Sequence, residues 1–259
     1  MLQGMSIKKY ATGGFAPSKA DIPGVLPEEG SSRSPCNSLR RLDTPLLTET
    51  VLVTISVILA FGVLRLGYFS TINWLVAPVV LVAAALIPTV IKGRKLAQIG
   101  FDASHIGASL RLLSVVCLVV FPMTFLFLWV LNLFGLELPL RTMLLPGQWW
   151  FSWLLYQFLY VGAAEEVFFR GYIQSNVLRL TDTIKSPQSW AQQWTVIVLS
   201  AAFFAAAHIV LQGHIIAALT FLPGLVLGWL FARTKSLLAP ILFHGLANTY
   251  YCLVLSILA

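Results

Sequence analysis

Charged residues are scarce in this chain of 259 residues: Asp, Glu, Lys and Arg make up 10% of it, whereas 58% is hydrophobic. The mean hydropathy of +0.84 is far above that of a soluble domain of this length. The formal net charge is +7, but the basic residues stand at the ends of apolar runs and form no patch interleaved with aromatics. The composition therefore predicts an integral membrane protein in a lipid bilayer and argues against nucleic acid as a partner.

Cysteine is also rare, and the three present have no paired spacing: Cys36, Cys117 and Cys252 lie far apart. This excludes a disulfide framework and a zinc knuckle. Residues 1–45 contain no continuous apolar core, which excludes a secretory signal. We interpret them as a disordered cytoplasmic tail rather than an organellar transit segment, because they carry acidic residues.

Seven apolar runs are long enough to cross about 30 Å of hydrocarbon. They cover residues 46–69, 72–91, 109–135, 148–180, 194–211, 214–232 and 237–258. The fourth is too long for one straight span, since it would extend roughly 50 Å. We expect it to tilt, to break or to lie partly at an interface, which leaves an eighth, partial span open. The predicted fold is an all-α, polytopic transmembrane bundle of about seven spans, with one domain over residues 46–259.

Lys and Arg gather in alternate connections between these runs, and only Arg65 and Arg141 fall on the opposite side. The positive-inside rule then places the N-terminus in the cytoplasm. A bacterial plasma membrane is the default location, with an organellar membrane as the alternative. Gly224 and Gly228 form a small-x-x-x-small step in the sixth run, which predicts close helix packing within the chain.

Carboxylates are rare inside the apolar runs, and the adjacent pair Glu165 and Glu166 lies well within the fourth. Burying ionisable residues in a bilayer is costly, so those that occur there are usually paired and functional. Glu166 and Arg170 are four residues apart and can form an ion pair on one helix face. Glu165 points about 100° away and needs a partner from another helix. The alternative is that Glu165, Glu166 and Arg170 form a buried ionic cluster that holds helices together and has no catalytic role.

Four histidines are present: His105 lies in a loop, His214 stands at the outer end of a run, and His208 and His244 lie well within runs. Counted along helices, Glu165, His208 and Asn248 each come roughly 20 Å deep, with His244 slightly shallower. His244 and Asn248 are four apart and face the same way. Such a cluster can hydrolyse peptides if Glu165 and His208 activate water while His244 and Asn248 stabilise an oxyanion.

These residues follow an ordered pattern on successive spans: Glu165-Glu166-x-x-x-Arg170, Phe204-x-x-x-His208 and His244-x-x-x-Asn248. The pattern resembles the CAAX protease and bacteriocin-processing family, also called ABI, over residues 148–252. The resemblance implies an α-helical intramembrane endopeptidase that uses Glu165, His208, His244 and Asn248 as catalytic residues. Glu166, Arg170 and Phe204 would support them.

The resemblance also bears on cofactors and substrates. Family members have been discussed as metal-dependent, and one Glu, two His and an Asn can in principle hold zinc. The chain has no HExxH motif, however, and we favour a glutamate mechanism without a cofactor. The implied partner is a membrane-associated protein or peptide substrate. Prenylated CAAX tails, bacteriocins and sorting anchors are not separated by the motifs.

Two other classes of protein compete with this interpretation. A proton-coupled transporter would also use buried Glu and His residues, but it predicts carboxylates on several helices and two related halves. Neither is visible in the sequence. A non-catalytic adaptor or bacteriocin-immunity factor of the same fold would not depend on Glu165, so substitution of Glu165 distinguishes it from a protease.

Overall fold

The computed structural model describes residues 43–66, 72–102, 104, 106–135, 149–182 and 189–258. The predicted tail over residues 1–45 lies outside them, except for its last three residues. Thr44 and Pro45 already belong to the first helix, because Asp43 caps it by accepting a hydrogen bond from the Leu46 N–H at 3.0 Å.

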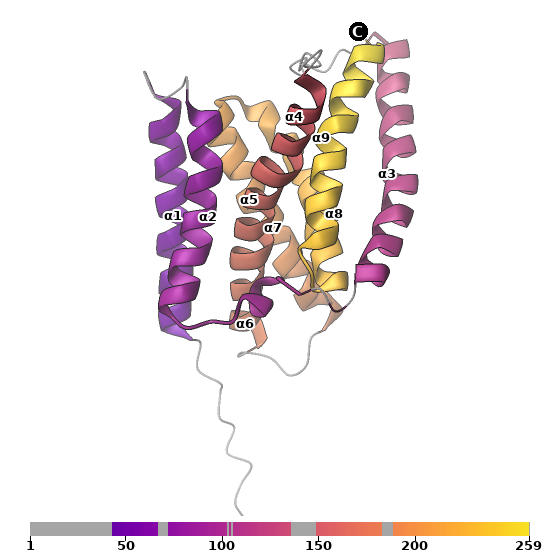
Figure 1. Cartoon of the computed structure of the whole chain (residues 1–259). Coiled ribbons are helices and arrows are strands. Elements are labelled where there is room, and N and C mark those ends of the chain that lie inside the picture. Colours follow the sequence, from indigo (N-terminus) through magenta and orange to yellow (C-terminus); the bar gives the residue numbers. More distant parts are fainter. Residues whose placement is uncertain are drawn as a thin grey trace, which may run out of the picture. The chain divides into compact units, whose positions relative to one another are not determined.

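The described residues form helices and no strands, which confirms the all-α prediction (Figure 1). The α-helices are α1 Thr44–Arg65, α2 Asn73–Ile91, α3 Ile106–Leu133, α4 Trp150–Leu155, α5 Ala163–Glu166, α6 Ser175–Asp182, α7 Trp190–Gln212, α8 Phe221–Thr234 and α9 Leu238–Leu258. Two short 3₁₀ helices, η2 Leu96–Ile99 and η6 Ile215–Thr220, and two π-helical segments, η4 Tyr156–Gly162 and η5 Val167–Gln174, complete the order.

Five helices of the described chain are long and apolar enough to cross a membrane: α1, α2, α3, α7 and the continuous η6–α8 helix over Ile215–Thr234. Helix α9 contributes a shorter apolar stretch, Leu238–Val254. The helical segment from Trp150 to Asp182, which runs from α4 to α6, is the remaining long helical part of the described chain. The protein is thus a polytopic helical membrane protein with a span count close to the predicted seven.

The long fourth apolar run forms one rod from α4 through η4, α5 and η5 to α6. Its junction residues Tyr156, Ala163, Val167 and Ser175 all have right-handed helical backbone angles. The described residues therefore show neither a break nor an eighth span here. Instead, two π segments widen the helix on either side of the short α5 that carries Glu165 and Glu166. Such π turns change which side chains share a face and are frequent at functional sites.

The rod lies between α2 and α9 and also contacts α7 and α8 (Figure 1). Its residues Ala164, Phe168 and Tyr172 belong to the same buried apolar cluster as Leu81 and Ala85 of α2. On the other side of the rod, a Cβ at Gly224 would lie 3.2 Å from the Ala201 Cβ of α7. This close approach of α8 to α7 confirms the packing predicted for the small-residue step.

Candidate active site

The side chains of Glu165, His208 and His244 come from three different helices and lie close together. The Oε2 atom of Glu165 lies 3.7 Å from the Nε2 atom of His208 on α7 and 3.7 Å from the Nε2 atom of His244 on α9. All three side chains are largely enclosed, with exposed fractions of 14%, 18% and 7%. The structure therefore brings together the carboxylate and both histidines that the sequence placed at similar depth.

Both imidazoles are oriented through their Nδ1 atoms. The Nδ1 of His208 lies 2.9 Å from the carbonyl oxygen of Phe204, which only accepts, so Nδ1 carries the proton. The Nδ1 of His244 lies 2.9 Å from the Oε1 of Glu166 and donates in the same way. When the rings are neutral, both Nε2 atoms are therefore acceptors that face Glu165.

Glu165 Oε2 is a buried oxygen without a hydrogen-bond partner in the described structure. Two Nε2 atoms face it, but 3.7 Å exceeds the length of an N–H···O hydrogen bond. Buried acceptors that face one another need a shared donor, and a water molecule has the two protons required. The arrangement is therefore suited to holding a water between a carboxylate and an imidazole, which is the requirement for activating it.

Glu166 and Arg170 form the predicted ion pair, with Nε and Oε2 3.2 Å apart and both side chains fully buried. Arg170 also donates to the Gly224 carbonyl of α8 at 3.0 Å, and its guanidinium lies 4.6 Å from the centroid of the Phe204 ring. These contacts offset the free-energy cost of burying the Arg170 charge. The sequence did not reveal that Glu166 also binds His244, because spacing predicts partners only within one helix.

Asn248 lies one helical turn beyond His244 on α9, and its Nδ2 donates to the Oε1 of Gln157 at 2.8 Å. Gln157 is buried in η4, and sequence reasoning missed it. The available signal was an amide within an apolar run, eight positions before Glu165. Gln157 fixes the direction of the Asn248 amide, which keeps a second N–H for another acceptor.

Two glycines let α9 approach the rod. A Cβ at Gly245, next to His244, would overlap the Phe158 ring, and a Cβ at Gly162 would lie 3.6 Å from the Cβ of His244 and 2.9 Å from the Gln157 carbonyl oxygen. Any larger residue at Gly245 requires the ring or the helix to move. Close packing between α9 and η4 thus sets the position of His244 relative to Glu165.

The donor set was also considered for zinc. A protein zinc site needs several ligands at about 2.0–2.2 Å around one point. Within the described ranges, no group of three or more His, Cys, Asp or Glu side chains is arranged to hold a metal ion. The geometry thus gives no zinc centre from which a reaction step could be derived.

The fold and the site define a helical membrane protein with a buried carboxylate and two histidines at its centre. Residues 147–250 match the family model described as "Type II CAAX prenyl endopeptidase Rce1-like". This match, over less than half of the chain, confirms the resemblance seen in the sequence and supports an intramembrane endopeptidase in general. No curated protein and no solved structure matches the chain.

Proposed function

We propose that the protein hydrolyses a peptide bond of a membrane-associated protein or peptide, with Glu165 and His208 activating water. The observation that supports this most directly is the buried Glu165 Oε2, which has no hydrogen-bond partner and faces two imidazole Nε2 atoms at 3.7 Å. A general base must come within reach of its proton directly or through one water, and this gap fits a water.

In the proposed reaction, the water oxygen attacks the scissile carbonyl carbon while one water proton passes to Glu165. The carbonyl π bond becomes an oxyanion, and the C–N bond then breaks as the proton is delivered to the leaving amine. His208 orients the water through its Nε2, because its Nδ1 proton is bound to the Phe204 carbonyl. No covalent enzyme intermediate is required.

Oxyanion stabilisation is assigned to His244 and Asn248. His244 donates from Nε2 only when both ring nitrogens carry protons, since Nδ1 already donates to Glu166. The carboxylates of Glu165 and Glu166 stabilise that cation, and with Arg170 the four charges sum to zero. Asn248, held by Gln157, supplies a neutral donor.

The family match favours a CAAX-type protease, and a prenylated C-terminal tail is the first substrate to test. Bacteriocins and sorting anchors stay as alternatives that the site chemistry does not separate. We further propose that no metal takes part, that the N-terminus is cytoplasmic and that the membrane is a bacterial plasma membrane, with an organellar membrane as the alternative.

The substrate class is tested with purified protein in lipid and a set of membrane-tethered peptides, prenylated and unprenylated. Peptide products are identified by mass spectrometry for the parent and for Glu165→Ala. Cleavage by the parent alone is the expected result and excludes the adaptor and transporter alternatives. Equal product from both proteins would contradict the role of Glu165.

A further inference from the structure

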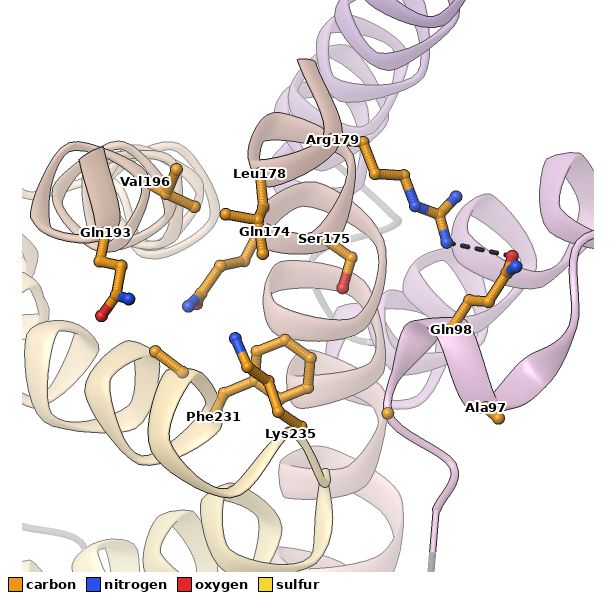
Figure 2. A pocket seen from close by; sticks show the side chains of 12 residues that line it. Ala97, Gln98, Gln174, Ser175, Leu178, Arg179, Gln193, Val196, Phe231 and Lys235 are labelled. Carbon is orange, nitrogen blue, oxygen red and sulfur yellow. Dashed lines mark hydrogen bonds between the residues drawn. The ribbon is translucent and has the colours of Figure 1, made fainter. Parts of the chain in front are cut away.

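A cavity of about 220 Å³ lies at the far end of η5. The rod contributes Gln174, Ser175 and Arg179, while η2 contributes Gln98, α7 contributes Gln193 and the end of α8 contributes Lys235 (Figure 2). Gln174 is nine positions after Glu165, which corresponds to about 14 Å along a helix. The cavity is therefore distinct from the Glu165 site.

The lining of this cavity is mixed, with two cations and several amide and hydroxyl side chains among apolar residues. It includes the cations Arg179 and Lys235 and the side chains of Gln174, Ser175 and Gln193, but no Asp or Glu. Arg179 donates to the Oε1 of Gln98 at 3.1 Å, which holds its guanidinium at the edge of the cavity (Figure 2). Arg179 also lines a neighbouring pocket with Glu49 and Asp43. Two cations beside hydroxyl and amide groups favour an anionic ligand with several oxygens.

Lys235 has an unusual backbone conformation for a lysine. Its φ of 55° and ψ of 16° are left-handed, and it is the one non-glycine residue with positive φ in the described part of the chain. Glycine is the usual residue where a helix ends this way, because a side chain adds strain there. Figure 2 shows the Lys235 side chain extending over Phe231 toward Gln174. This strained position places the lysine side chain in the lining of the cavity.

The surrounding residues place the cavity near a membrane–water interface. Trp190 and Trp194 pair edge to face in the first turns of α7, next to Gln193, and the Trp190 ring is exposed. Indole rings favour the headgroup level of a bilayer. Basic pockets between transmembrane helices at this level bind anionic headgroups.

We propose that this cavity binds the phosphate of an anionic membrane lipid through Lys235 and Arg179. The bound headgroup would connect the end of the catalytic rod to η2, α7 and α8. The inference is independent of the protease mechanism, because no residue of the Glu165 cluster lines the cavity.

The test uses the full-length protein purified from mixed phosphatidylglycerol and phosphatidylcholine, with retained lipids counted by native mass spectrometry. The variants are Lys235→Gly, which suits the left-handed backbone and removes the ammonium, and Arg179→Gln. Arg233→Gln is the matched control, because it removes one charge two positions from Lys235 but does not line the cavity. Thermal unfolding verifies that each variant is folded.

We expect the parent and Arg233→Gln to retain phosphatidylglycerol preferentially. Lys235→Gly and Arg179→Gln should each lower that preference about fivefold. An equal preference in all four proteins would overturn the proposal. A parallel arm adds inorganic phosphate to protein in phosphatidylcholine alone. If inorganic phosphate raises the thermal unfolding temperature of the parent, and the parent shows no preference for phosphatidylglycerol, the ligand is a soluble anion. That result would refute the lipid source.

Discussion

Neighbouring carboxylates in this site have different surroundings. Glu166 is fully buried and contacts both Arg170 and His244 directly, whereas Glu165 faces two imidazole Nε2 atoms at 3.7 Å, which is beyond hydrogen-bond length. Burial with direct ion-pair and hydrogen-bond contacts describes a supporting residue, while a carboxylate that faces two imidazoles across a water-sized gap suits the reactive role. Stability and activity should therefore depend on the two residues differently.

Glu166→Ala should destabilise the fold more than Glu165→Ala. The first change leaves the buried Arg170 charge without its carboxylate and releases His244, at a cost of about 3–5 kcal/mol. The second removes a group with no hydrogen-bonded partner at Oε2. Thermal unfolding and recovery of monodisperse protein in lipid measure the difference. An equal loss of folded protein in both variants would contradict this division of roles.

Gln157→Met should lower kcat by about tenfold, the effect of losing one hydrogen bond of ~1.4 kcal/mol, with little change in KM. Methionine keeps the shape but cannot hold the Asn248 amide. The change should add little to Asn248→Ala, since Gln157 acts through that residue. Full additivity of the two substitutions in the double variant would show that Gln157 does not work by positioning Asn248.

Much of the site could be predicted from single residues and their spacing. The contacts that could not be predicted join different helices. Depth along each helix predicted that Glu165, His208, His244 and Asn248 share a layer, and the first three meet in the structure. The bonds from Glu166 to His244 and from Gln157 to Asn248 join different helices, at 2.9 Å and 2.8 Å. Their formation depends on helix rotation, which a single sequence does not determine.

Among the elements, the rod was the hardest to predict. Its length predicted a tilt, a break or an interfacial part. The described residues show no break, and two π segments that were not predicted flank the glutamate pair. Periodicity of 3.6 residues cannot anticipate a π turn, because the extra residue is absorbed only where packing favours it. The other six apolar runs correspond to helices with ends shifted by a few residues.

Gly245→Ala should destabilise the contact between α9 and η4 by about 1–3 kcal/mol, because the new methyl group overlaps the Phe158 ring. It should also reduce cleavage, since His244 is the adjacent residue. Phe158→Ala combined with Gly245→Ala should recover part of the activity by restoring space.

The control for this prediction is Gly107→Ala in α3, where a Cβ meets nothing within 4 Å. Alanine in an open helical position should leave stability unchanged or raise it by about 0.5–1 kcal/mol. The measurement is the melting temperature, in the same lipid, of Gly245→Ala, of Gly245→Ala combined with Phe158→Ala, and of Gly107→Ala. A Gly245→Ala protein as stable and active as Gly107→Ala would show that the close approach is not needed.

For the whole molecule, the expected topology assigns the end that carries Arg94, Arg179 and Lys235 to the cytoplasm. An ion pair between Glu49 and Arg94, with 2.7 Å between Nη1 and Oε1, joins α1 to the segment after α2 at this end. Tyr172 of the rod donates to the same Glu49 at 3.0 Å. The basic end is thus connected directly to the rod that carries Glu165.

This topology can be measured with single cysteines in a chain whose native cysteines are replaced by serine. In intact cells, a membrane-impermeant maleimide should label Asn132→Cys at the end of α3 but not Arg233→Cys at the end of α8. Permeabilised cells should label both positions. Labelling of Arg233→Cys alone in intact cells would reverse the orientation and contradict the positive-inside argument.

The most direct test of the account is the rate of peptide cleavage by the parent and Glu165→Gln, each assayed in lipid with and without a strong metal chelator. Glutamine keeps the size of the side chain but cannot accept the water proton, so we expect a loss of at least about 10²-fold. The parent rate should not change with the chelator. A parental rate in Glu165→Gln, or abolition of parental cleavage by the chelator with recovery on adding zinc, would contradict a metal-free glutamate protease.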